Sequence, residues 1–131
     1  MSELEPTLGT LLYIEDDPAA LELMQSLLSR HRPAVRLLVA TDGLSGLRLA
    51  QAERPDVIFV DLQLPDVDGV ELLAVLHRLD GVQATPLVAL SAQAGRDAIA
   101  RAVAAGASSF VAKPVDLQRV LALVDTFIRP R

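Results

Sequence analysis

Short apolar runs alternate along this chain with longer segments in which apolar residues recur every three or four positions. The runs cover residues 10–14, 35–40, 57–60, 86–90 and 109–112. Short apolar runs that end in turn-forming residues are typical of buried strands. The segments between them, residues 18–30, 43–53, 69–79, 95–105 and 117–127, have the spacing of amphipathic helices. The pattern therefore predicts five strands that alternate with five helices.

The apolar runs also indicate how the strands are arranged. They are too uniformly apolar for a sheet with one face in water, whereas a parallel sheet with helices on both faces buries both sides of each strand. Crossovers between parallel strands are right-handed, which restricts the topology further. We therefore predict an α/β domain with a doubly wound, five-stranded parallel sheet. The patterning alone leaves the order of the strands open.

The helical segments differ in how much apolar surface they offer. Residues 117–127 carry the clearest stripe, whereas Leu44, Leu47 and Ala50 form a weaker face that Gln51 interrupts. Residues 95–105 are rich in alanine, with Ile99 and Val103 as the only large apolar side chains, so we expect this helix to pack lightly. Four aspartates precede helices and are expected to cap them: Asp17, Asp42, Asp68 and Asp116.

Composition narrows the class of protein. The 131 residues are 51% hydrophobic and only 3% aromatic, which fits one domain with an aliphatic core, residues 10–131, after a lead-in at residues 1–9. With 17 acidic and 12 basic residues and no basic stretch among aromatics, direct nucleic-acid binding is not expected. No apolar run approaches the roughly 20 residues that span a bilayer, so no membrane segment is expected. The chain has no cysteine, which excludes thiol chemistry and is consistent with a cytoplasmic location.

Polar side chains stand at the ends of four of the predicted strands. Glu15 and Asp16 follow the first strand, Asp61 the third, Ser91 the fourth and Lys113 the fifth. One such residue is ordinary turn chemistry, but the carboxyl ends of parallel strands meet at one edge of a sheet, where α/β proteins bind ligands. Clustered carboxylates repel one another unless a hard cation such as Mg²⁺ lies between them. Lys113 and Ser91 would suit anionic oxygens, which indicates a phosphoryl group and a carboxylate nucleophile.

These residues carry a resemblance to a known family. The motifs are Tyr13-Ile14-Glu15-Asp16-Asp17-Pro18, the stretch from Asp61 through Pro65 to Gly69, Leu90-Ser91-Ala92 and Lys113-Pro114. Together, in this order, they resemble the receiver domain of two-component response regulators over residues 10 to 128. The resemblance implies a flavodoxin-like sheet with strand order 2-1-3-4-5.

The resemblance also implies roles for individual residues. Asp61 would accept a phosphoryl group from a phosphohistidine on a sensor histidine kinase or a histidine phosphotransfer protein. The protein would not be an enzyme acting on other molecules, but a phosphoacceptor that catalyses its own aspartyl phosphorylation and dephosphorylation. Asp16, Asp61 and the backbone carbonyl of Gln63 would ligate Mg²⁺, with Glu15 acting through a water. Lys113 would offset charge in the transition state.

The switch residues are implied in the same way. Ser91 would bond a phosphoryl oxygen once it is attached, and Phe110 would turn inward as Ser91 moves. Lys113-Pro114 would form the cis peptide bond of the family. Gln63 and Gln93 lie where the family tunes dephosphorylation. We expect helix 95–105, strand 109–112 and helix 117–127 to form the surface that partners read.

The sequence departs from the family pattern at two places that affect function. Glu15 replaces the more common aspartate, and its extra methylene favours contact with a metal through water. Ser108-Ser109-Phe110 lacks the Asp-Asp-Tyr pattern of receivers that dimerise on DNA-binding regulators. This weakens the case for a homodimer through helix 95–105, strand 109–112 and helix 117–127, without removing it.

Several alternatives stay open at this point. We expect a stand-alone receiver or a phosphorelay shuttle that signals to an unknown downstream protein; the runner-up is a receiver excised from a longer regulator or hybrid histidine kinase. A degenerate receiver that binds partners without phosphorylation is a second alternative. A third is suggested by Asp66-Val67-Asp68-Gly69-Val70, which resembles the motif of haloacid-dehalogenase-type phosphatases. That phosphatase would depend on Asp66 and not on Asp61.

Overall fold

The computed structural model describes residues 8–128 of the chain. Most of the predicted lead-in, residues 1–7, and the last three residues, 129–131, lie outside the described part. Strands and helices alternate throughout, as predicted. The strands are β1 (Gly9–Ile14), β2 (Val35–Ala40), β3 (Val57–Asp61), β4 (Leu87–Ser91) and β5 (Ser109–Ala112). The helices are α1 (Pro18–His31), α2 (Gly43–Glu53), α3 (Gly69–Arg78), α4 (Arg96–Ala104) and α5 (Leu117–Phe127).

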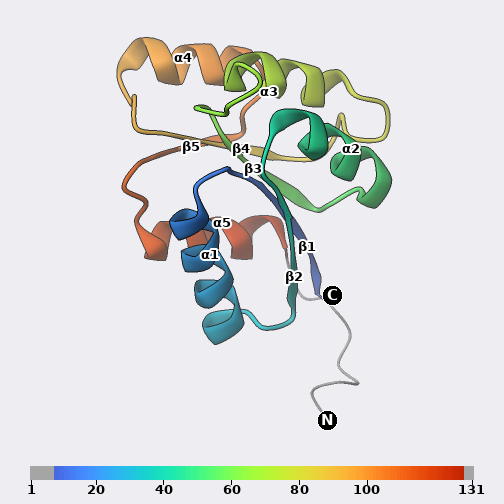
Figure 1. The fold of residues 1–131 in the computed structure, drawn as a ribbon, viewed down its shortest axis with the longest axis vertical. Coiled ribbons are helices and arrows are strands. Elements are labelled where there is room, and N and C mark those ends of the chain that lie inside the picture. Colours follow the sequence, from blue (N-terminus) through green and yellow to red (C-terminus); the bar gives the residue numbers. More distant parts are fainter. Residues whose placement is uncertain (1–7, 129–131) are drawn as a thin grey trace.

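All five strands pair in parallel, in the order β2-β1-β3-β4-β5. Helices α1 and α5 cover one face of the sheet, and α2, α3 and α4 cover the other (Figure 1). Each face has its own apolar cluster, one with residues of α1 and α5 and one with residues of α2, α3 and α4. The predicted doubly wound sheet and its strand order are confirmed.

This topology has a switch point at one edge of the sheet. The chain leaves β1 toward α1 on one face, and leaves β3 toward α3 on the other, although β1 and β3 are neighbours. The two loops therefore diverge at the carboxyl ends of the strands. Such a switch point is where open α/β sheets bind ligands.

Helix α2 packs differently from the prediction. Leu44, expected on its apolar face, is 53% exposed, whereas Gly43, Gly46 and Ala50 are buried. The helix lies so close to the sheet that a Cβ atom on Gly46 would come within 2.5 Å of Ile14 Cδ1. The close approach is made through small residues, which a search for large apolar side chains does not find.

The remaining helices follow the sequence. The four predicted aspartate caps are confirmed, because each side chain accepts a hydrogen bond from a backbone N–H in the first turn. In α4, Ala102 is buried while Ile99 and Val103 are 38% and 56% exposed. The light packing predicted for this helix is therefore confirmed.

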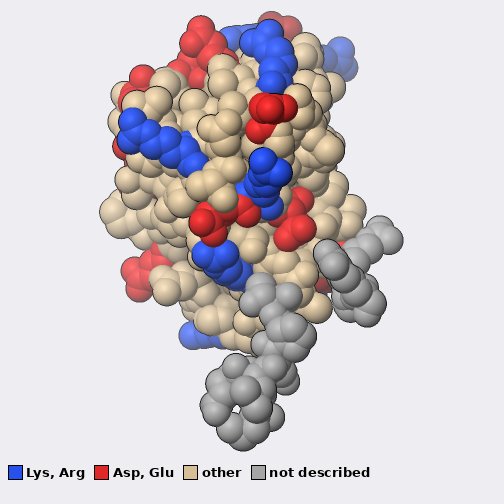
Figure 2. Space-filling model, turned by 90° about the vertical axis from the view of Figure 1, so that its right-hand side faces the viewer, with Lys and Arg blue, Asp and Glu red and all other residues tan. Residues whose placement is uncertain are grey.

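The surface at the amino ends of the strands carries both signs of charge. Figure 2 shows basic and acidic side chains interspersed over this face of the described residues, with no uniform basic area on it. Arg36 on β2 pairs with Glu53 of α2 at 3.0 Å, which is one such contact between opposite charges. Within residues 8–128, no helix is both long enough and apolar enough to cross a bilayer.

Candidate functional site

The structure brings the predicted strand-end residues together at the carboxyl edge of the sheet. Strands β1, β3, β4 and β5 lie side by side in that order. Glu15 and Asp16 follow β1, Asp61 and Ser91 are the last residues of β3 and β4, and Lys113 follows β5. Glu15, Asp61 and Ser91 are buried, which is unusual for two carboxylates unless they have partners.

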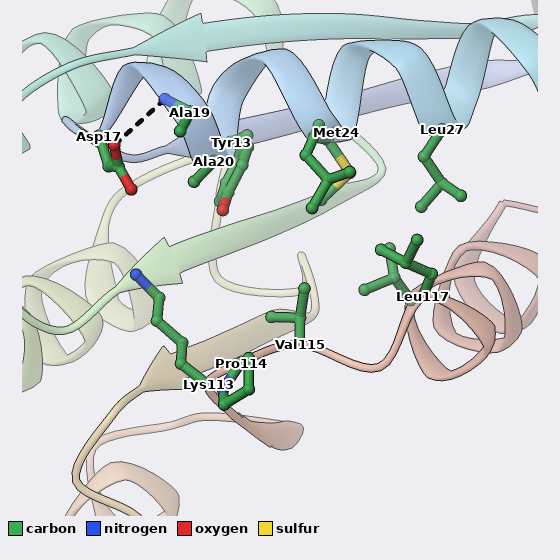
Figure 3. Close-up of a pocket in the computed structure, with 12 residues that line it drawn as sticks. Tyr13, Asp17, Ala19, Ala20, Met24, Leu27, Lys113, Pro114, Val115 and Leu117 are labelled. Carbon is green, nitrogen blue, oxygen red and sulfur yellow. Dashed lines mark hydrogen bonds between the residues drawn. The ribbon is translucent and has the colours of Figure 1, made fainter.

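Lys113 is the cation that pairs with both buried carboxylates. Its Nζ lies 2.9 Å from Glu15 Oε1 and 3.3 Å from Asp61 Oδ1. The side chain reaches the site from the turn after β5, beside Pro114 (Figure 3), and the Lys113-Pro114 peptide bond is cis, as predicted. Burial lowers the pKa of Lys113, but the bond to Glu15 and the charge of Asp61 outweigh this, so that the pKa is raised. Lys113 is therefore a permanent positive charge at the site.

Glu15 is held by donors on both of its carboxylate oxygens. Oε1 accepts from the Tyr13 hydroxyl at 3.1 Å as well as from Lys113, and Oε2 accepts from the backbone N–H of Asp17 at 3.2 Å. Burial would raise the pKa of Glu15, but hydrogen bonds with Asp61, Lys113 and Asp17 lower it below the ordinary glutamate value. Glu15 is thus the more acidic member of the carboxylate pair.

Asp61 shows the opposite shift. Burial and the hydrogen bond with Glu15 raise its pKa to about 6, while the Gln63 N–H, which donates to Asp61 Oδ1 at 3.1 Å, and Lys113 pull the pKa down. Two buried carboxylates this close compete for one cation, so one of them keeps its proton to a higher pH. Asp61 therefore keeps its proton to a higher pH than Glu15 does.

Three carboxylates form a group that fits a divalent cation. Glu15, Asp16 and Asp61 each offer an oxygen, and these oxygens lie within 4.8 Å of one another. Asp16 is exposed, so the group opens to solvent on its side. An all-oxygen donor set with several carboxylates suits Mg²⁺, which keeps part of its water shell. The backbone N–H of Gln63 contacts this group through its hydrogen bond to Asp61. That the Gln63 carbonyl ligates the cation stays a prediction.

Ser91 lies beside this group and is held by two donors. Its Oγ accepts from the Gln63 side-chain amide and from the Gln93 N–H, each at 3.0 Å. With both lone pairs engaged, the hydroxyl hydrogen is left to donate. The contact from the Gln63 side chain was not predicted, because a long amide side chain can reach many partners and its sequence position does not select one.

Phe110 is half-buried on β5 and packs against the apolar cluster under α3 and α4. It lies on the strand that leads directly to Lys113, as its sequence position requires. The inward movement predicted for it stays a prediction.

The contacts of two residues at or near the site were not predicted from the sequence. The Tyr13 hydroxyl is buried against Glu15, and burial together with that negative charge raises its pKa, so it stays a donor. Asp66 accepts from Gly43 N at 2.8 Å and Leu44 N at 3.1 Å, and these backbone donors lower its pKa. Asp66 is thus a second cap of α2, a use that disfavours the phosphatase reading in which it would be the nucleophile.

An apolar groove of about 280 Å³ adjoins the site between α1 and the segment after β5. Tyr13 and Lys113 line the end nearest the carboxylates, and Leu117 lines the part farther away (Figure 3). A second pocket of about 280 Å³ lies on the other side, where Gln63, Ser91 and Arg101 are among the lining residues. An apolar groove and a more polar pocket therefore adjoin the carboxylate site.

Comparisons with known proteins agree with this geometry. The family model described as the response regulator receiver domain matches residues 11–125. The transcriptional regulatory protein CseB of Streptomyces coelicolor is 35% identical over 119 residues, which make up 91% of this chain and 49% of CseB. The signal transduction histidine-protein kinase BarA of Escherichia coli is 32% identical over 111 residues, 85% of this chain and 12% of BarA.

A solved structure shows the same fold. The phosphorylated cyanobacterial phytochrome response regulator RcpA superposes with a TM-score of 0.80 at 27% identity, over 91% of this chain and 93% of RcpA. The chain spans about half the length of CseB and a smaller part of BarA. The similarity therefore concerns one domain of those longer proteins.

Proposed function

The chain belongs to the response regulator receiver family of two-component signalling, and we propose that it accepts a phosphoryl group on Asp61 and thereby changes which partner it binds. The observation that carries this proposal is the position of Asp61. Its buried carboxylate ends β3, contacts Lys113 at 3.3 Å and shares a group of acidic oxygens with Glu15 and Asp16. A structural aspartate would need neither the lysine nor the acidic neighbours.

The proposed donor is a phosphohistidine on a sensor histidine kinase or a histidine phosphotransfer protein. An Asp61 carboxylate oxygen attacks the phosphorus, the phosphorus–nitrogen bond breaks, and the electron pair leaves with the imidazole, which takes up a proton. The product is an acyl phosphate on Asp61. The contact between Lys113 Nζ and Asp61 supports a role for Lys113 as a donor to a phosphoryl oxygen. Transfers of this kind depend mainly on positioning and charge.

The donor set fits Mg²⁺ as the cofactor. Asp16 and Asp61 would ligate it directly with the Gln63 carbonyl, and Glu15 would act through a water. When bound, the cation offsets the charge of the carboxylates and of the phosphoryl oxygens. The chain's own contribution is to hold three carboxylates within reach of one cation and to keep Lys113 beside them.

The proposed switch begins at Ser91. Its hydroxyl hydrogen is free to donate to a phosphoryl oxygen, and a movement toward Asp61 would break the bond from the Gln63 side chain. Phe110, half-buried two strand positions below the end of β5, would then move inward. The readout surface would be α4, β5 and α5, because α4 is lightly packed and exposes Ile99 and Val103. A homodimer through this surface is one use of it; an unidentified downstream protein is another.

The proposal concerns one domain, and it does not depend on whether that domain stands alone or belongs to a longer protein. The same chemistry serves a stand-alone regulator, a phosphorelay shuttle, or a receiver within a longer regulator or kinase. The similarity to parts of CseB and BarA supports the last of these settings. In each setting the chain is a phosphoacceptor that catalyses its own aspartyl phosphorylation and dephosphorylation. We also propose a cytoplasmic location.

The test uses phosphoramidate, whose phosphorus–nitrogen bond reproduces that of phosphohistidine. Intact mass is measured for the wild type and Asp61→Asn after incubation with and without Mg²⁺. We expect one phosphoryl group on the wild type only, and only with Mg²⁺. No addition under any condition would leave the degenerate receiver as the better description. Addition to Asp61→Asn would place the acceptor elsewhere.

A further inference from the structure

The Tyr13 hydroxyl is a buried polar group that the proposed phosphotransfer does not use. Tyr13 is 3% exposed on β1, and its ring packs edge-on against Phe59 of β3, with centroids 6.4 Å apart and an interplanar angle of 83°. Residues two apart along a strand point to the same side of the sheet. The ring therefore lies directly beneath the Glu15 side chain, and its hydroxyl donates to Glu15 Oε1 at 3.1 Å.

The donors around Glu15 have different origins. Lys113 Nζ belongs to the proposed chemistry, since it also contacts Asp61, and the Asp17 N–H is part of the backbone. Among the hydrogen bonds of the described residues, Tyr13 supplies the side-chain donor to Glu15 that makes no hydrogen bond or ion pair with Asp61. Its role toward this carboxylate can therefore be separated from the role of Lys113.

Glu15 needs such a donor more than an aspartate would. The extra methylene of glutamate adds a rotatable bond, so its carboxylate can take more positions relative to Asp16 and Asp61. Tyr13 and Lys113 both donate to Oε1. Their side chains come from β1 and from the turn after β5 (Figure 3). Two donors from separate elements fix one oxygen, and the Asp17 N–H fixes the other.

We propose that Tyr13 is a positioning residue of the acidic site, whose hydroxyl holds the Glu15 carboxylate in place beside Asp16 and Asp61 for binding of a divalent cation. This inference rests on the cation site of the proposed function. Tyr13 acts through Glu15 and does not contact the cation or the phosphoryl group. Partners that orient metal ligands typically change metal affinity by about 10-fold or more when they are removed.

The test is a double-mutant cycle on Mg²⁺ binding, measured by calorimetry on the unphosphorylated protein. Tyr13→Phe removes only the hydroxyl and keeps the ring on Phe59. We expect it to weaken Mg²⁺ binding by about 10-fold in the wild-type background. In a Glu15→Asp background, where the shorter carboxylate does not reach the hydroxyl, the same change should alter the affinity by less than about twofold.

A matched control separates the hydroxyl from core packing. Leu27→Ala truncates a buried side chain of α1 in the same apolar cluster as Tyr13. It should lower the midpoint of thermal unfolding and leave the Mg²⁺ affinity within about twofold, since it touches no donor of the site. A second readout is the rate of phosphorylation by phosphoramidate. Tyr13→Phe should raise the Mg²⁺ concentration for half-maximal rate and leave the rate at saturating Mg²⁺ within about twofold.

The outcomes distinguish this inference from the proposed function. If the wild type binds Mg²⁺ and Asp16→Asn weakens that binding, but Tyr13→Phe does not, the positioning role is wrong and the cation site stands. An equal loss in the wild-type and Glu15→Asp backgrounds would also overturn the positioning role. If the wild type binds no Mg²⁺, the cation site itself is wrong, and the role of Tyr13 falls with it.

Discussion

At the scale of single residues, the site has more buried negative charge than the chain can neutralise. Glu15 and Asp61 share one lysine. Burial and the nearby Glu15 raise the pKa of Asp61 to about 6. In the metal-free protein, ionisation of Asp61 therefore lowers the free energy of unfolding. The same shortage of positive charge is what makes the group attractive to a divalent cation.

This shortage predicts how stability depends on pH without metal. The folded state keeps the Asp61 proton up to about pH 6, whereas the unfolded chain releases it near the ordinary value of 3.8. Stability therefore falls as pH rises between these values, and the loss is complete above about pH 6. Asp61→Asn should stabilise the protein at pH 7 by about 1–2 kcal/mol, less than the full shift implies because the attraction to Lys113 is lost too.

The measurement is urea unfolding of the wild type and Asp61→Asn in the presence of a chelator. The gain from the substitution should shrink toward zero near pH 3.5, where Asp61 is protonated in both states. Asp80→Asn, at an exposed carboxylate in the loop after α3, is the control and should show little change. If Asp61→Asn stabilised the protein equally at pH 7 and at pH 3.5, the proposed excess of negative charge at the site would be wrong.

Single residues also show what the sequence could predict. Glu15, Asp16, Asp61, Ser91 and Lys113 were found because each directly follows or ends an apolar run, and parallel strands bring such ends together. The bonds from Tyr13 to Glu15 and from Gln63 to Ser91 could not be found this way, because they depend on the direction of a side chain. Asp66 was missed because its partner, the first turn of α2, is 22 or 23 residues away along the chain.

At the scale of elements, α2 shows that small residues can decide packing. Its stripe of large residues predicted Leu44 at the core, but the helix buries Gly43, Gly46 and Ala50 instead, and it approaches the sheet most closely at Gly46. Asp66 then caps this helix from the loop that follows the Asp61 strand. Two features therefore position α2 on the domain: its close approach to the sheet and the hydrogen bonds to Asp66 from its first turn. A broad apolar face is not what holds it.

Gly46→Ala tests the close approach. Alanine favours a helix over glycine by about 1 kcal/mol, but its Cβ would meet Ile14 Cδ1 at 2.5 Å and Cγ1 at 2.9 Å. Ile14 is fully buried, so overpacking of about 1–3 kcal/mol should win, and we expect a net loss of about 1 kcal/mol in urea unfolding. In an Ile14→Val background, which lacks Cδ1, the same substitution should cost less or stabilise. Stabilisation in the wild-type background would show that α2 is not held at this distance.

At the scale of the whole molecule, the sheet connects a site on buried strands to a surface that includes the lightly packed helix α4. β3 and β4, which end in Asp61 and Ser91, are buried throughout, whereas α4 buries only Ala102 among its described residues. If Ser91 or Phe110 moves on phosphorylation, we expect α4 to shift with it, because α4 is lightly packed. Weakly packed elements of this kind are the ones that move in regulatory transitions.

Phosphorylation should therefore shift amide resonances along α4 more than along α1. The measurement compares ¹H–¹⁵N spectra of the wild type before and after treatment with phosphoramidate and Mg²⁺. Asp61→Asn under the same treatment controls for binding of the reagents. Unchanged resonances over Gly95–Ala105 in a protein shown by mass to be phosphorylated would rule out α4 as part of the readout surface.

The central claim is that Asp61 carries the phosphoryl group, and the most direct test is to find the carboxylate that does. Borohydride reduces an aspartyl phosphate to homoserine, so the phosphorylated protein can be reduced, digested and sequenced by fragmentation mass spectrometry. We predict homoserine at residue 61 and aspartate at residues 66 and 68. Homoserine at residue 66, or at any position other than 61, would contradict the account of this site.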